Sequence, residues 1–224
     1  MVYFTNTFYF EVPQNLRHFY INVMRKIFLY LLLPLLLASC GNNTKKVLVL
    51  THDNPSINED AGTVDCKTTR GHVEKELDFK GSSLKVSTAA GDATLSIPDK
   101  GYYIANLKNN DTIIGSYQHF SAQGAAQKVI TQDDLKKKID SLIQLSQGKN
   151  VSDANRNYFI PPNTVAKITS NPDAFIVAPY HQMTSIPQQD DKEPEVYQFY
   201  TINEVREMIA NLQKLTTPEK SPNQ

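Results

Sequence analysis

Residues 84–114, LKVSTAAGDATLSIPDKGYYIANLKNNDTII, decide the predicted fold. Leu84, Val86 and Thr88 alternate with more polar residues, which is the period of a half-buried strand. The apolar runs of this stretch are separated by three turn sequences: Gly91-Asp92, Asp99-Lys100-Gly101 and Asn109-Asn110-Asp111. Short strands at this spacing predict an antiparallel β meander.

Two amphipathic helices follow parts of the meander. The first begins at Thr131, with Asp134 three residues on, and the second begins at Thr201, with Glu204 three residues on. A hydroxyl followed at this spacing by an acidic residue indicates a capping box. Apolar residues then recur at helical spacing, and Gly148 ends the first run. The predicted class is α+β: an antiparallel β meander with two capped amphipathic helices.

The two helices and the strands before them are similar. Residues 131–142 and 201–212 share a threonine, an acidic, an apolar and a basic residue at corresponding positions. The strands in front of them follow Ile97-Pro98 in one case and Ile160-Pro161 in the other. One interpretation is a duplicated strand-strand-helix unit, over 96–147 and 159–215. The alternative is that any two well-capped amphipathic helices look alike.

A leucine-rich segment precedes the globular part of the chain. Met24-Arg25-Lys26 supplies two cations, and the apolar run over 27–37 is shorter than the roughly 20 residues of a spanning helix. The run ends in Leu37-Ala38-Ser39-Cys40. This pattern resembles the lipobox of bacterial lipoproteins. The resemblance implies cleavage before Cys40, a diacylglyceryl group on its thiol and a further acyl chain, such as palmitate, on the new N-terminus. The alternative is an uncleaved signal anchor in which Cys40 is incidental.

The resemblance also sets the predicted organisation of the chain. The predicted segments are an upstream leader and signal peptide (1–39), a lipidated N-terminus and tether (40–62), an α+β envelope domain (63–215) and a disordered tail (216–224). Residues 1–23 are predicted to be an extended leader or to precede the true start at Met24. In many bacterial lipoproteins an aspartate directly after the lipidated cysteine retains the protein in the inner membrane, and an acidic run there resembles a surface-export signal. The chain has Gly41 at this position and no acidic run after it. The expected location is therefore the outer membrane, facing the periplasm.

Composition and motifs narrow the function classes. The chain has 23 basic and 23 acidic residues, so it has no excess positive charge of the kind that favours binding to nucleic acid. The chain holds no Gly-rich phosphate loop, no Gly-x-Ser-x-Gly elbow, no HExxH and no paired CxxC. With Cys40 lipidated, Cys66 remains as a lone thiol, expected to be buried or else available for intermolecular pairing. No cofactor is predicted.

Four residues are candidate binding residues. His119 follows Asp111 by eight residues, and His181 follows Asp173 by eight, so each pair shares one face of an extended strand. Histidine and carboxylate together suit zinc, which makes a pair of related sites one interpretation. The alternative is two exposed histidines at strand ends, because eight residues exceed most single strands. The four residues are kept as binding candidates without a predicted metal.

Two classes of function remain. The first is a non-catalytic envelope lipoprotein, held to the membrane by lipid on Cys40, that docks an envelope protein partner through its sheet or an aromatic face. The second is an envelope hydrolase or metal-binding protein whose site is assembled from distant residues such as His119, His181 and Asp173. The absence of catalytic motifs favours the first.

Overall fold

The computed structural model describes residues 44–119, 130–185 and 194–216 of the chain. These residues belong to one compact unit, 44–224, and the other unit, 1–43, lies outside the described residues. The predicted signal peptide, Cys40 and nearly all of the predicted tail therefore also lie outside them.

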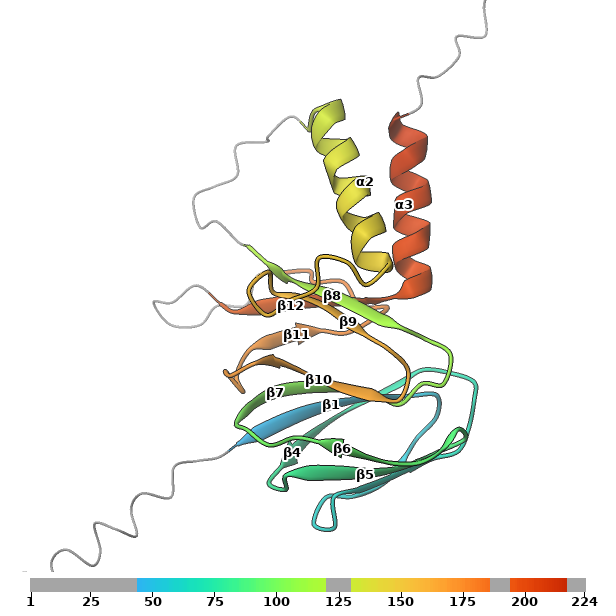
Figure 1. Cartoon of the computed structure of the whole chain (residues 1–224), viewed down its shortest axis with the longest axis vertical. Coiled ribbons are helices and arrows are strands. Elements are labelled where there is room, and N and C mark those ends of the chain that lie inside the picture. Colours follow the sequence, from blue (N-terminus) through green and yellow to red (C-terminus); the bar gives the residue numbers. More distant parts are fainter. Residues whose placement is uncertain (1–43, 120–129, 186–193, 217–224) are drawn as a thin grey trace, which may run out of the picture. The chain divides into compact units, whose positions relative to one another are not determined.

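The described strands form three four-stranded sheets, which Figure 1 shows with the two helices beyond them. The central sheet has the order β10 (Thr164–Thr169), β7 (Gly101–Asn106), β1 (Lys45–Thr51) and β4 (Val73–Phe79). The helix-side sheet has the order β11 (Phe175–Val177), β12 (Val196–Thr201), β8 (Ile113–Gln118) and β9 (Asn157–Ile160). The outer sheet has the order β2 (Ser56–Asn58), β3 (Thr63–Cys66), β5 (Ser83–Thr88) and β6 (Gly91–Ser96).

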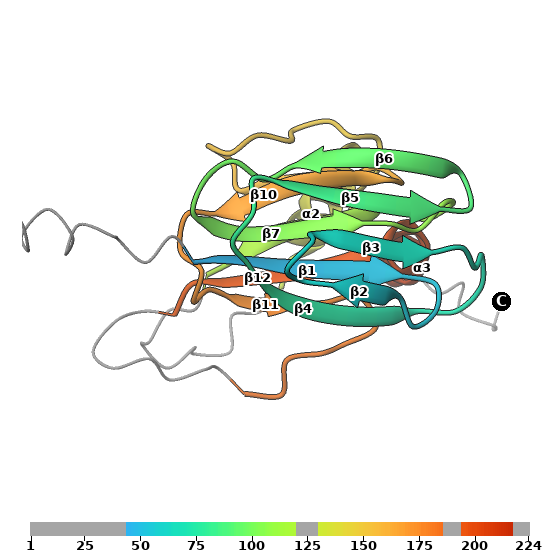
Figure 2. The same cartoon turned by 90° about the horizontal axis from the view of Figure 1, so that it is seen from below.

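The central sheet is buried on both faces, and its sequence explains why. In β1 every residue from Val47 to Thr51 is buried, as expected of a strand covered on both sides. Val47 and Val49 pack against the outer sheet, which lies over the central sheet in Figure 2. Leu48 and Leu50 point the other way and pack against the helix-side sheet. Side chains alternate along a strand, so a continuous apolar run fills two cores.

The helix-side sheet also contributes to two layers. Phe199 and Tyr197 of β12 pack against the central sheet, whereas Ile114 of β8 packs against the helices. Gly115 lies opposite Phe199 in the ladder, and a Cβ at this glycine would lie 2.2 Å from the phenylalanine ring. This close approach explains a glycine inside a buried strand.

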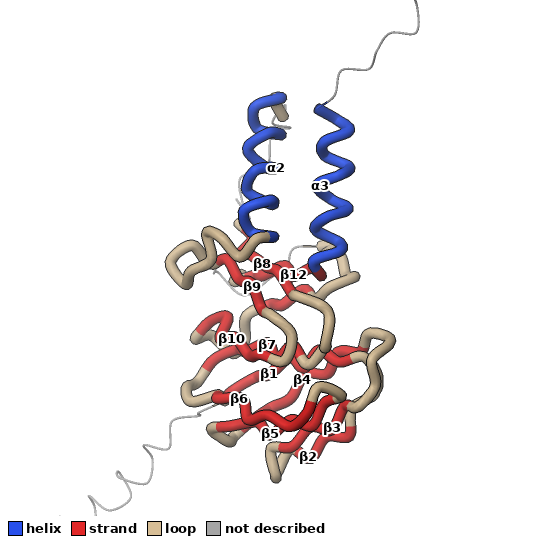
Figure 3. The backbone as a smooth tube through the Cα atoms, turned by 45° about the vertical axis from the view of Figure 1, so that its right-hand side comes forward, coloured by secondary structure: helices blue, strands red, loops and turns tan. Residues whose placement is uncertain are grey.

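The two helices project from the outer face of the helix-side sheet, as Figure 1 shows, and contact it near one end of each helix. They are α2 (Gln132–Ser146) and α3 (Ile202–Thr216), which lie side by side in Figure 3. Both predicted capping boxes are confirmed: Asp134 N–H donates to the Thr131 hydroxyl, and Glu204 N–H donates to the Thr201 hydroxyl. The positive φ of Gly148, 69°, lies just after the end of α2, as predicted for a terminating glycine. The α+β class is therefore shown.

The predicted antiparallel meander is wrong, because all three sheets are mixed. β1 pairs with β7, β3 with β5, and β11 with β12 in parallel. Close turn spacing favours sequential hairpins, but β7 and β8 belong to different sheets and so do β9 and β10. The chain uses these tight connections as corners between layers, where the two strands diverge instead of pairing.

The predicted boundary between tether and domain needs correction as well. Residues 44–62, assigned mostly to a tether, are part of the same compact unit as the remainder of the described chain. β1 is an inner strand of the central sheet, and β2 is an edge of the outer sheet. The folded domain therefore begins at about Thr44 and not at Thr63.

Candidate functional site

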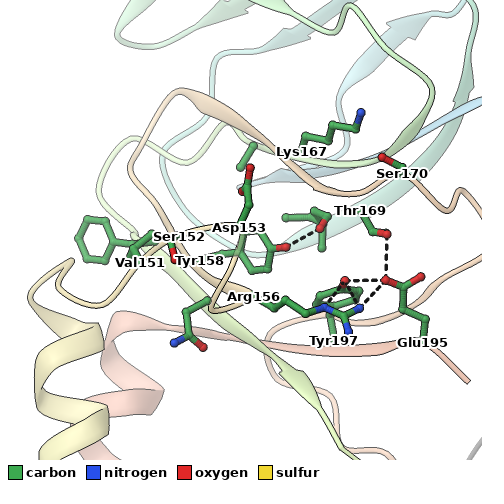
Figure 4. A pocket seen from close by; sticks show the side chains of 14 residues that line it. Val151, Ser152, Asp153, Arg156, Tyr158, Lys167, Thr169, Ser170, Glu195 and Tyr197 are labelled. Atoms are coloured by element: carbon green, nitrogen blue, oxygen red, sulfur yellow. Dashed lines mark hydrogen bonds and ion pairs between the residues drawn. The ribbon is translucent and has the colours of Figure 1, made fainter. Parts of the chain in front are cut away.

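The main candidate site lies where β9 and β10 diverge at a corner of the chain (Figure 4). Each of these strands is an edge strand, β9 of the helix-side sheet and β10 of the central sheet. The pocket between them has a volume of about 770 Å³, within the usual range for ligand sites. Its walls come from β9, β10, the loop over 151–156 and the start of β12.

Arg156 is the centre of the polar side chains in this pocket. Its guanidinium donates from Nε and Nη2 to the Tyr197 hydroxyl at 3.2 and 2.6 Å, and from Nη2 to Glu195 at 2.5 Å. The same guanidinium lies over the Tyr117 ring, 3.5 Å from its centroid. Figure 4 shows this network at one end of the pocket.

The backbone at Arg156 is held in the left-handed region, with φ at 51°. An arginine there costs about 1–3 kcal/mol of strain and persists only where its surroundings enforce it. Tyr117 N–H donates to the Arg156 carbonyl at 3.0 Å, which fixes the peptide beside β8. The side-chain network and this hydrogen bond together determine the conformation.

Glu195 receives the remaining donors of the network. The Tyr197 hydroxyl donates to it at 2.7 Å, Thr169 at 2.9 Å and Asn171 at 3.1 Å. Burial alone would raise the pKa of Glu195, but these hydrogen bonds and the charge of Arg156 outweigh burial and lower the pKa. Burial, together with the bond to Glu195, raises the pKa of Tyr197. At neutral pH the site therefore holds a carboxylate, a guanidinium and a neutral phenol.

Replacing Glu195 by glutamine tests this charge state through stability. Because the folded pKa is lowered, the carboxylate stabilises the fold above its unfolded value of about 4.3, and this contribution is lost as pH falls. Glu195→Gln is expected to lower the free energy of unfolding at pH 7 by about 1–2 kcal/mol. Below about pH 4.5, the free energy of unfolding of the variant is expected to fall less steeply with decreasing pH than that of the parent chain. Urea titrations between pH 3 and 7 measure both effects. Asp153→Asn, at an exposed carboxylate of the same pocket, is the control, and an identical response in the two variants would contradict the assignment.

The structure separates the first predicted pair, Asp111 and His119. Asp111 precedes β8 and forms an ion pair of 3.2 Å with Lys108, whose side chain is 1% exposed. His119 follows β8 at its other end, is exposed, and contacts Tyr117 edge-on. The two residues flank opposite ends of the strand.

The second predicted pair is separated too, but His181 meets other partners. Asp173 is exposed in the turn before β11. His181 Nε2 lies 3.3 Å from a Glu74 oxygen, and His72 Nε2 contacts the other oxygen of the same carboxylate. The structure thus brings together His72, Glu74 and His181 beside a second pocket of about 410 Å³ between β4 and β11.

A buried tyrosine and a strained tyrosine lie near these histidines and Glu74. The Tyr102 hydroxyl donates to Glu76, and burial, followed by this bond, raises the pKa of Tyr102. Tyr180 adopts φ of 66° and contacts the His72 ring edge-on, with a centroid distance of 4.8 Å. Across the described residues, no three His, Cys, Asp or Glu side chains are arranged to hold a metal ion.

Cys66 is a free and buried thiol, one of the two alternatives expected.

Sequence reasoning missed the residues of the larger pocket. The four binding candidates that the sequence suggested do not include Arg156, Glu195 or Tyr197. These three residues are separated along the chain and meet only because β12 and the loop over 151–156 flank the same corner. No local motif could have identified them.

In the part of the chain that the structure describes, no helix has the length and apolar character needed to cross a membrane. No protein-family model matches the sequence, and neither a curated protein nor a solved structure matches it significantly.

Proposed function

We propose that the chain is a lipid-anchored envelope protein that acts as a non-catalytic binding or accessory protein, through the pocket between β9 and β10. The single observation behind the binding role is that pocket: about 770 Å³, placed between two edge strands and closed at one end by the Arg156–Glu195–Tyr197 network. A strained arginine at such a place is typical of a functional site.

A binding role accounts for the chemistry of the pocket better than catalysis does. Arg156 and Glu195 neutralise each other, and the pKa directions of Glu195 and Tyr197 move both groups away from neutral pH. A general acid or base works best with a pKa near the operating pH. The network therefore supports a fixed wall for recognition.

The proposed anchor is lipid on Cys40, in the outer membrane and facing the periplasm. Support comes from the lipobox-like sequence, and β1 begins at Lys45, soon after this cysteine. The chain over 41–44 reaches at most roughly 15 Å when extended, so the domain would remain close to its bilayer. Such a position suits an accessory subunit of another envelope protein.

Filling the pocket tests the binding role. Ala166 of β10 lines the pocket and is half-buried, so Ala166→Phe is expected to occupy it without removing a side chain from either core. In detergent-solubilised membranes, the parent chain is expected to co-purify with a stoichiometric partner and the variant to lose most of it. Thr94→Phe, exposed on the outer sheet, is the matched control and should retain the partner. Equal recovery with both variants would remove the pocket from the binding role.

An envelope hydrolase is the second candidate function, favoured by the His72–Glu74–His181 cluster. Two histidines on one carboxylate, beside a pocket of about 410 Å³, could supply acid–base chemistry from distant parts of the chain. Turnover of an esterase and peptidase substrate panel by the purified protein, lost in His181→Gln, would favour this candidate over the first.

We also propose that residues 96–147 and 159–215 are a duplicated strand-strand-helix unit. Corresponding strands pair with each other: β7 with β10 in the central sheet and β8 with β12 in the helix-side sheet. Superposing the Cα atoms of the two units tests this, and agreement restricted to the helices would contradict it.

A further inference from the structure

Backbone groups of β10 point into the pocket region without a partner, and their positions follow from the ladder. Leu107 N–H donates to Leu50 O at 2.9 Å, so the odd-numbered residues of β7 direct their peptide groups toward β1. The even-numbered residues of β7 therefore face β10, where Ile104 lies opposite Ala166 and Asn106 opposite Thr164. The N–H and C=O of Val165 and Lys167 must then point outward.

These outward groups are free among the described residues, since none of them donates to or accepts from Val165 or Lys167 on that side. Beyond them the edge ends, because the Tyr158 hydroxyl donates to the carbonyl of Ile168 at the bulge between Lys167 and Thr169. The free edge is thus a short, defined segment of β10.

Two of the other edges, β4 and β9, are protected in ways that β10 is not. By the same alternation, the residues of β4 whose N–H and C=O groups point away from β1 are Glu74, Glu76 and Asp78. Their negatively charged side chains discourage pairing with a further strand. On β9, Asn157 N–H donates outward to Ser152 O at 3.4 Å, which covers part of that edge. β10 has one outward charge, Lys167, whose partner Asp99 lies at 3.8 Å and is 71% exposed.

We propose that β10 binds an extended peptide segment of a partner protein as an added antiparallel strand. The residue of the peptide opposite Ala166 would enter the pocket, which requires an apolar side chain beside the small alanine and Tyr158. The residue opposite Lys167 would lie on the other face, where a Glu or Asp complements the lysine. Main-chain hydrogen bonds to Val165 and Lys167 supply affinity, and these two side-chain positions supply specificity. This inference rests on the proposed binding function and names its ligand class.

A nonapeptide of sequence TVEVTVEVT, labelled with fluorescein, is the probe, and full-length protein in detergent is the receptor. It is expected to bind in fluorescence anisotropy at concentrations below about 1 mM, and its lysine analogue TVKVTVKVT at least tenfold more weakly. N-methylation of the Thr and Glu residues, which face β10, should abolish binding. N-methylation of the Val residues, whose N–H groups point away, should leave it.

Proline substitution tests the receptor side. Lys167→Pro removes an outward N–H and none of the ladder to β7, so the fold should be retained while binding falls at least about tenfold. Asp78→Pro makes the same change on the outward side of β4 and should bind the probe like the parent chain. Lys167→Gln keeps the N–H and should lose only the preference for Glu over Lys in the peptide.

The outcomes separate this inference from the proposed function. No binding of the probe up to about 1 mM, equal binding by Lys167→Pro and Asp78→Pro, or undiminished binding of the peptide methylated at Thr and Glu would each overturn strand addition. If those results accompany loss of the partner in Ala166→Phe, the pocket still binds, but not by strand addition. Retention of the partner in Ala166→Phe would instead refute the proposed function.

Discussion

Replacing Cys40 by alanine is expected to abolish incorporation of radiolabelled palmitate and to release the protein from the membrane fraction. The thiol is the only attachment point that the lipobox-like sequence Leu37-Ala38-Ser39-Cys40 offers to a diacylglyceryl group. One acyl chain gives only marginal membrane binding, whereas two or more anchor a protein stably. Loss of the thiol is therefore expected to remove the whole proposed anchor.

The second cysteine provides the control for this experiment. Cys66 is 4% exposed, so Cys66→Ser should leave labelling and membrane association unchanged in cells that express the full chain. Fractionation of membranes and anti-protein blotting measure release directly. Undiminished labelling of Cys40→Ala would refute the lipoprotein assignment and favour the uncleaved anchor.

Replacing Lys45 by methionine is expected to destabilise the fold by about 2–4 kcal/mol. Lys45 is 6% exposed, and its ammonium donates to the carbonyls of Gly81, Ile97 and Pro98 at 2.8, 2.8 and 3.0 Å. Methionine fills a similar volume but leaves the buried Ile97 carbonyl and the partly buried carbonyls of Gly81 and Pro98 without this donor. A buried acceptor without a donor costs about 1–3 kcal/mol, and the partly buried acceptors cost less because water can replace the ammonium. Removal of the desolvated charge offsets part of the loss.

The neighbouring residue, Lys46, provides the control for this prediction. Lys46 points to the other face of the same strand and forms an exposed ion pair of 3.4 Å with Glu76, so Lys46→Met should change stability by about 1 kcal/mol or less. Urea unfolding of both variants at pH 7 gives the comparison. If Lys45→Met lost no more than Lys46→Met, the three carbonyl contacts would contribute nothing net.

Local features of the fold could be predicted from the sequence because they depend on neighbouring residues. The capping boxes at Thr131 and Thr201 involve side chains three residues apart, and the strands over 84–114 follow from alternation and from the turn residues between them. Sheet membership could not be predicted in this way. Whether β7 pairs with β8 or with β1 depends on which apolar faces meet, and that is decided by packing of the whole domain.

Contacts between distant elements show the same limit. Lysine is rarely buried, so Lys45 in a polar segment was naturally assigned to a tether, and only the loops around it reveal its three acceptors. His181 was paired with Asp173 by spacing, whereas the structure pairs it with Glu74 of a distant strand. Spacing predicts contacts within an element, but it carries no information on contacts between elements.

The place of β1 has a mechanical consequence for a domain held by its N-terminus. Tension on Cys40 would reach the fold first at Lys45, where β1 begins. This strand pairs with β4 along seven residues and with β7 along six. It is therefore an inner strand, and it cannot separate from the sheet by breaking the hydrogen bonds on one side alone. Pulling it out requires both ladders to break together and exposes the two largest hydrophobic clusters. Under the proposed lipid anchor, tension between the bilayer and a bound partner would therefore act on the strand that has the longest ladders on both sides among the described strands.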